Sequence, residues 1–230
     1  MRRVAITQSN YIPWKGYFDL IDCVDEFILY DDMQYTKRDW RNRNKISTPQ
    51  GLKWLTIPVN VKGKFHQKIN ETTISDKSWS VEHFQTIKHF YSKSPFFSHY
   101  EELLAEFYLT NEEEFLSRVN FKLISLICQI LDIDTRITFS SDYELSEGKS
   151  EKLIGICKQA SADVYVSGPA AKTYFDEALA EKNNIKVEWK GYEGYPEYQQ
   201  MHEPFEHGVS ILDLIFNKGP EAKEFIKIKK

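Results

Sequence analysis

The chain has 230 residues, 41% of them hydrophobic and 28% charged, which is ordinary for a globular protein with a large core. Its net charge of −4 excludes whole-molecule attraction to nucleic acid. No apolar run approaches the roughly 20 residues of a membrane span or forms a signal peptide. The three cysteines lie far apart in apolar settings, which favours reduced thiols in the cytoplasm.

The first thirty residues predict a βαβ unit. Residues 4–7 (VAIT) form a short β-rich run that ends at a polar loop, and residues 17–23 have helical spacing. Residues 26–30 (EFILY) then predict the next strand. Two further strands are expected at 52–59 and 69–74, with the Pro of the first suited to a sheet edge.

The sequence pattern changes at residue 78, where apolar residues begin to recur every three or four positions. This pattern predicts a helical block over residues 78–131, interrupted at Ser94-Pro95. Its strongest helix is expected over 111–131, with the acids of NEEEF in the first turn, where the helix dipole favours them.

Alternating strands and helices resume after this block. Strands are expected at 136–139, 164–166 and 185–189, and helices at 148–160, 170–182 and 209–216. The pattern predicts an α/β fold with a Rossmann-like, mostly parallel sheet and a helical insertion or subdomain. Residues 1–77 and 132–230 are expected to form one compact unit around the block 78–131.

Four predicted strands end in polar or glycine-containing sequences. Because ligands of α/β proteins bind beyond the carboxyl ends of the strands, these ends together would line one cleft; alternatively they are ordinary turns. The four sequences are Gln8-Ser9-Asn10, Asp31-Asp32, Ser140-Ser141-Asp142 and Ser167-Gly168-Pro169.

The segment YDDMQYTKRDWRNRNKI, residues 30–46, combines carboxylates, aromatic rings and basic groups directly after a predicted strand. Arg41 and Arg43 flank Asn42, so in an extended chain both would point the same way and could clamp a diphosphate. Trp40 and Tyr35 offer ring faces for a base or a sugar. The alternative is a solvated charged hairpin.

Asp31 and Asp32 should point to opposite faces, so at most one faces a given cleft, where it could hold an amine, a ribose or a metal. The alternative is an ion pair with Arg38, Arg41 or Arg43. His202, in the aromatic loop YPEYQQMHEPFEHG, is a candidate general base. The histidine spacing predicts no metal site, and no motif for nucleophilic hydrolysis is present.

Several stretches together resemble the WbqC-like family over nearly the whole chain. They are TQSNYIPWKGYFDLIDCVDEFILYDDMQYTKRDWRNRNKI, WLTIPV with the following HQKIN, VYVSGPAAKTYFDE and YPEYQQ with SILDLIFNKG. In one departure, Ser9 stands where the family usually has Pro after Gln8. The resemblance places these residues in the cleft: Gln8, Tyr11, Pro13, Trp14, Gly16, Tyr17, Asp31, Gln34, Tyr35, Trp40, Asn42, Arg43, Ser167, Gly168, Tyr174, Tyr198 and Gln200.

The resemblance implies a bacterial protein associated with O-antigen or other surface-polysaccharide (lipopolysaccharide) biosynthesis. Together with the arginines that could clamp a diphosphate and the aromatic rings that could stack a base or a sugar, the resemblance leads us to expect a transferase. This enzyme would move an acyl or aminoacyl group to the amine of a nucleotide-linked amino sugar. Asp31 or His202 would take the amine proton, and Asn10 and Arg41 would join the binding residues. The alternatives are a non-catalytic accessory protein and a divergent nucleotidylyltransferase; the sequence identifies no cofactor.

Overall fold

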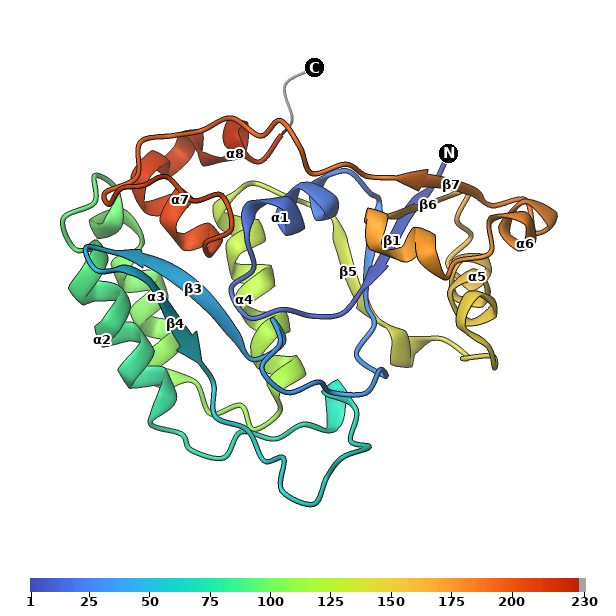
Figure 1. Cartoon of the computed structure of the whole chain (residues 1–230), viewed down its shortest axis with the longest axis horizontal. Coiled ribbons are helices and arrows are strands. Elements are labelled where there is room, and N and C mark those ends of the chain that lie inside the picture. Colours follow the sequence, from blue (N-terminus) through green and yellow to red (C-terminus); the bar gives the residue numbers. More distant parts are fainter. Residues whose placement is uncertain (228–230) are drawn as a thin grey trace.

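A five-stranded parallel sheet forms the centre of the computed structural model, which describes residues 1–227 (Figure 1). The strands are β1 (Arg3–Thr7), β2 (Glu26–Leu29), β5 (Arg136–Phe139), β6 (Val164–Ser167) and β7 (Lys186–Trp189). Their spatial order is β5-β2-β1-β6-β7, with β1 paired to β2 and β6 in parallel register. This order confirms the predicted Rossmann-like fold. The chain adds β2 and β5 on one side of β1 and then β6 and β7 on the other, so the order of addition reverses between β1 and β6.

Helices cover both faces of the sheet because successive strand residues are apolar on both sides. In β1, Ala5 packs with α1 (Lys15–Asp22) and α4 (Leu116–Ile130), whereas Val4 and Ile6 pack with α5 (Lys149–Gln159) and α6 (Glu177–Lys182). The result is a three-layer arrangement with apolar cores on both faces of the sheet.

The chain between β2 and α4 forms an extension beside α1 and α4 (Figure 1). It contains an antiparallel hairpin of β3 (Arg43–Thr48) and β4 (Gly51–Thr56), followed by the helices α2 (Trp79–Tyr91) and α3 (Phe97–Thr110). From the other end of the chain, α7 (Ile211–Lys218) packs against this extension, with Phe216 against the rings of Tyr91 and Phe97. The remaining short elements are η1 (Ile69–Glu71), η2 (Ser140–Asp142), η3 (Pro169–Thr173), η4 (Gly219–Glu221) and α8 (Ala222–Phe225).

Four predicted elements were wrong in their bounds or type. The strand expected over residues 52–59 is β4, which ends at Thr56, so Pro58 lies outside it. Residues 69–74 form the short 3-10 helix η1 and two isolated bridges instead of a strand, because the Asn70 N–H donates to the carbonyl of Asp31. The helix expected from residue 111 begins at Leu116, so the acids of NEEEF precede its first turn. The helix expected over 170–182 is divided into η3 and α6.

Within residues 1–227, no helix is both long enough and apolar enough to cross a membrane.

Candidate functional site

The carboxyl ends of four adjacent strands meet along one edge of the sheet, because β5, β2, β1 and β6 are neighbours and all run parallel. Side chains connect these ends directly. The Ser9 N–H, after β1, donates to Asp31 Oδ1, after β2, at 2.8 Å. The Ser140 hydroxyl, after β5, donates to Asp32 Oδ2 at 2.6 Å. Three of the four polar strand-end sequences are thus hydrogen-bonded in two pairs, whereas Ser167-Gly168-Pro169 lies at the end of the neighbouring strand β6 and does not line the cavity described below.

A cavity of about 380 Å³ opens beyond the ends of β2 and β5. Of the residues predicted to bind or react, Asp31 alone lines it, joined by Asp32, Ser140 and Ser141 from the predicted strand ends. Asp31 and Asp32 both reach the cavity because both follow the end of β2, where strand alternation no longer applies. The complete lining is Leu29, Asp31, Asp32, Lys68, Asn70, Glu71, Phe115, Ser117, Arg118, Phe139, Ser140 and Ser141.

Asp31 is the most deeply buried carboxylate of this cavity, with 1% of its surface exposed. Burial raises its pKa, although hydrogen bonds from the Ser117 hydroxyl and the Ser9 N–H, together with the charge of Arg41, oppose the rise. A carboxylate with a raised pKa at a cavity wall is suited to accept a proton from a ligand. The predicted ion pair with a nearby arginine does not form, because Ser9 and Ser117 occupy both carboxylate oxygens.

The opposite wall comes from the segment after β4. Lys68 Nζ lies 3.4 Å from Asp32 Oδ1, and Asn70 Nδ2 donates to the same oxygen at 3.3 Å. The amide oxygen of Asn70 is buried and accepts no hydrogen bond from residues 1–227. Because a buried acceptor without a donor costs free energy, this oxygen is a candidate acceptor for a ligand N–H or O–H group.

Arg118, on the first turn of α4, supplies the free positive charge of the cavity. Its guanidinium stacks on Phe139 at 4.5 Å from the ring centroid. No carboxylate in the described chain lies within ion-pair distance of this guanidinium, whereas Lys68 is paired with Asp32. Arg118 can therefore receive an anionic group of a ligand.

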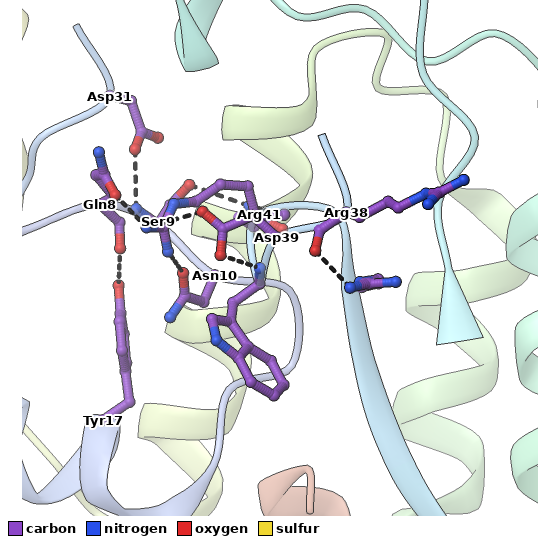
Figure 2. Close-up of polar contacts among 11 residues, drawn as sticks. Gln8, Ser9, Asn10, Tyr17, Asp31, Arg38, Asp39 and Arg41 are labelled. Atoms are coloured by element: carbon purple, nitrogen blue, oxygen red, sulfur yellow. Dashed lines mark hydrogen bonds and ion pairs between the residues drawn. The ribbon is translucent and has the colours of Figure 1, made fainter. Parts of the chain in front are cut away.

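Arg41 lies at the neighbouring strand end, where Figure 2 shows it between Gln8, Asn10 and Asp39. Its guanidinium donates to the side-chain oxygens of Gln8 and Asn10. Arg43 instead donates to the carbonyl of Arg38 and stacks on Trp54 at 4.1 Å. The two guanidiniums thus have different partners, because residues 41–42 form a turn and the extended strand begins at Arg43.

Trp40, in the turn before β3, and Trp54, in β4, form an exposed pair of rings. Trp40 and Trp54 are each 41% exposed, and their ring centroids are 5.4 Å apart. Lys45 approaches both rings, at 5.8 and 5.6 Å. Trp40 is therefore accessible to a ligand, and its stacking against a base or a sugar ring stays a prediction.

Other predicted ring residues are buried. Tyr35 is 6% exposed and burial raises its pKa to about 12. Tyr11 is fully buried, and its hydroxyl contacts His83 Nδ1 at 2.8 Å and the Tyr108 hydroxyl at 2.9 Å. Tyr17 is 6% exposed and donates to the Gln8 carbonyl at 3.1 Å (Figure 2). In this conformation Tyr11 stabilises the extension, and Tyr17 positions the loop after β1.

The remaining predicted residues lie at several places. Gln34 is exposed, bridges to Lys68 and donates to the Phe65 carbonyl, and Asn42 is buried against the Ile57 carbonyl. Tyr174 is 52% exposed and does not line the cavity, although it lies close enough to Tyr30, after β2, to add to the rise that burial causes in the pKa of that hydroxyl. Ser167 accepts from the Tyr165 hydroxyl at the end of β6, and Gly168 follows it close to the ring of Tyr192.

Two predicted residues, Trp14 and His202, contact the irregular segment 190–210. Trp14 packs edge-on against Tyr192 and Tyr195. His202 lies close enough to buried Asp213 of α7 to influence the pKa of that carboxyl group. His202 does not line the cavity. The neighbouring Lys15 is nearly buried beneath the rings of this segment, and burial lowers its pKa to about 8.

The parallel sheet and its strand-end cavity define a Rossmann-like α/β protein with a helical extension. The sequence matches the WbqC-like protein family over residues 8–225, and the chain belongs to that family. It is 52% identical over 227 residues to the protein named Uncharacterized protein Rv1507c of Mycobacterium tuberculosis (strain ATCC 25618 / H37Rv), which covers 99% of this chain and 98% of the relative. No solved structure matches the chain significantly.

Proposed function

We propose that the protein transfers an acyl or aminoacyl group to the amine of a nucleotide-linked amino sugar in bacterial surface-polysaccharide (O-antigen) biosynthesis. One observation carries the proposal: the cavity presents a buried carboxylate, Asp31, and the guanidinium of Arg118, which has no ion-pair partner within residues 1–227. A ligand that fits both must carry an amine and an anionic group, as a nucleotide-linked amino sugar does. The biosynthetic setting rests on the family resemblance.

The chemistry assigned to Asp31 is general-base catalysis. The protonated amine of the sugar gives its proton to the Asp31 carboxylate, and the neutral amine then attacks the donor carbonyl. A carbon–nitrogen bond forms, the bond between the carbonyl carbon and the leaving group breaks, and the amine's remaining extra proton goes to solvent or to the leaving group. Burial of Asp31 moves its pKa toward the working pH, which improves it as a base.

The neighbouring strand ends provide the binding surface for the rest of the ligand. A cavity of about 380 Å³ accommodates a sugar but is small for a complete nucleotide sugar. The reversal point between β1 and β6 lies next to it along the sheet edge, and nucleotides bind at such points in Rossmann-like folds. Trp40 and Trp54 then offer a stacking surface for the base.

Calorimetric titration with UDP- and dTDP-linked amino sugars tests the proposal. Arg118→Ala should weaken binding about tenfold, as expected for loss of one charge-assisted contact. Arg136→Ala, which removes an exposed arginine at the opposite end of strand β5, is the matched control and should bind as the unsubstituted protein does. The corresponding sugars with hydroxyl in place of amine should bind more weakly, because they lack the charge that Asp31 attracts.

Folded protein that binds none of these sugars at about millimolar concentration contradicts the proposal. If the sugars bind but Asp31→Asn leaves amide formation unchanged with a suitable donor, Asp31 is not the base. If a reconstituted pathway forms its product equally well with Asp31→Asn and Arg118→Ala proteins, the chain is an accessory protein and not the transferase.

A further inference from the structure

A second hollow, larger than the candidate site, lies between α3 and α4. Its volume is about 890 Å³, and the loop that joins the two helices also lines it. We call it the α3–α4 groove. It is lined by Leu103, Glu106, Phe107, Thr110, Asn111, Glu112, Glu113, Glu114, Phe115, Phe121, Lys122, Ser125, Leu126 and Gln129.

The groove has an apolar floor supplied by both helices. On α3, Leu103 and Phe107 are one turn apart, and on α4, Phe121 and Leu126 face them. Leu103 is 36% exposed, and Phe115, in the joining loop, is 43% exposed. Apolar side chains gathered in a hollow and open to water are typical of surfaces that bind a partner.

The rim of the groove is acidic. Four glutamates line it against a single lysine, Lys122, which is paired with Glu113 at 2.5 Å. Glu114 has one distant partner, Lys77, at 3.5 Å. Glu106 and Glu112 have no ion-pair partner within residues 1–227. The negative potential of this rim favours cations and repels anionic ligands.

We propose that the α3–α4 groove is the docking site for a basic amphipathic helix of a partner protein. The apolar floor is flanked by two helices, an arrangement that receives the apolar face of a third helix. The acidic rim matches lysine and arginine residues on the flanks of that helix. Strand addition does not fit, because the groove walls are helices and a loop and offer no strand edge.

The groove also adjoins the candidate site, since Phe115 lines both hollows. The ring of Phe121, in the groove, packs on the ring of Phe139, in the cavity, at 5.0 Å. A partner seated in the groove would therefore lie beside the cavity that we assign to the sugar. The docking proposal does not depend on that assignment, because it rests on the groove alone.

The proposal is tested with a fluorescently labelled, helix-forming peptide of leucine and lysine, roughly 18 residues or five turns long. Fluorescence anisotropy measures its binding to the full chain. A second peptide has the same leucines and glutamate in place of lysine. We expect saturable binding of the basic peptide and at least about tenfold weaker binding of the acidic one.

Two pairs of variants assign the binding to the groove. Leu103→Asp should weaken binding of the basic peptide at least about tenfold, whereas Leu109→Asp, which alters a more exposed leucine of α3 outside the groove, should not. Glu106→Lys should weaken binding of the basic peptide several-fold, because charge reversal removes one exposed ion pair and adds a repulsion of similar size. Glu102→Lys, also on α3 but outside the groove, should not.

Equal loss of binding with the groove and control variants overturns the proposal, as does equal binding of the two peptides. A self-interface is the competing occupant. If sedimentation shows that the chain dimerises and that Leu103→Asp alone makes it monomeric, the groove binds a second copy and not a basic helix. Circular dichroism of each variant establishes that it is folded.

Discussion

At the scale of single residues, two buried carboxylates have similar chemistry and different surroundings. Asp213 is fully buried and accepts hydrogen bonds from the hydroxyls of Tyr91 and Tyr198, each at 2.8 Å. Asp31 is equally buried in its own loop but borders a cavity. Burial raises the pKa of both groups. Their contrast separates a structural carboxylate from one that a ligand can reach.

The raised pKa values predict how stability changes with pH. The folded protein binds these protons more tightly than the unfolded chain, whose aspartate pKa is about 3.9, so the free energy of unfolding should fall as pH rises above about 4. Asp31→Asn removes one of these ionisable groups and should make the fall with rising pH smaller. The Asn amide oxygen can still accept from the Ser9 N–H, and the Ser117 hydroxyl can turn to accept from its nitrogen.

Urea unfolding at pH values of about 4.5 and 7.5 measures this change. Asp213→Asn is the matched control: it should also reduce the pH dependence, but it should leave binding of the amino sugar intact. A pH dependence unaltered in both variants would contradict the raised pKa values. If Asp213→Asn also loses sugar binding, a loss of binding in Asp31→Asn cannot be assigned to the cavity, because both substitutions would then act by disturbing the structure.

At the scale of elements, the start of α1 is fixed by close contact between Trp14 and Gly16. A Cβ atom placed on Gly16 would lie 2.3 Å from the Trp14 ring, which is itself held against Tyr192 and Tyr195. Gly16→Ala should therefore lower the free energy of unfolding by about 1–3 kcal/mol through overpacking. Gly155→Ala, in α5, is the control, because its nearest atom is Ser146 Oγ at 3.3 Å.

Chemical denaturation compares the two substitutions. Because alanine favours a helix over glycine, Gly155→Ala should be neutral or stabilising by up to about 1 kcal/mol. Equal effects of the two substitutions would mean that Trp14 moves aside without cost. The loop that carries Gln8 and Asn10 would then be less firmly held than these contacts indicate.

Local patterns were sufficient to predict the sheet, because each strand and its polar end lie within a few consecutive residues. They failed where long-range backbone pairing decides the conformation. Residues 72–74 pair with 114–116: the Ile74 N–H donates to the Glu114 carbonyl and the Leu116 N–H to the Thr72 carbonyl. This pairing keeps residues 111–115 out of the helix, and nothing in the sequence of either segment identifies the other.

The same limitation applied to the candidate site. Asp31 was predicted because it directly follows a strand, and strand ends bind ligands in α/β folds. Ser117 and Arg118 were not, because they lie on the amphipathic helix α4, whose pattern indicates only packing. Their only signal was that residue 118 is a basic position on the exposed side of the helix, a feature shared by many surface lysines and arginines.

At the scale of the whole molecule, one apolar core joins stretches that are far apart in the sequence. It includes Ala5 of β1, Leu123 of α4 and Phe216 of α7. A second core, on the other face of the sheet, contains Ile154 of α5 and the β1 residues Val4 and Ile6. Because β1 contributes side chains to both cores, disruption of one core should also disturb the other through this strand. The helical block 78–131 shares its core with the rest of the chain.

This shared core predicts that the chain unfolds in a single cooperative transition. Leu123→Ala removes a fully buried side chain of the first core and should cost about 2–5 kcal/mol, lowering the melting temperature by on the order of 10 °C. Ile154→Ala does the same in the second core. Far-ultraviolet circular dichroism and tryptophan fluorescence should shift together in each variant, since neither core can persist without the strand that they share. Two separate transitions, one moved by each substitution, would instead mean that the helical block and the α5–α6 side unfold independently.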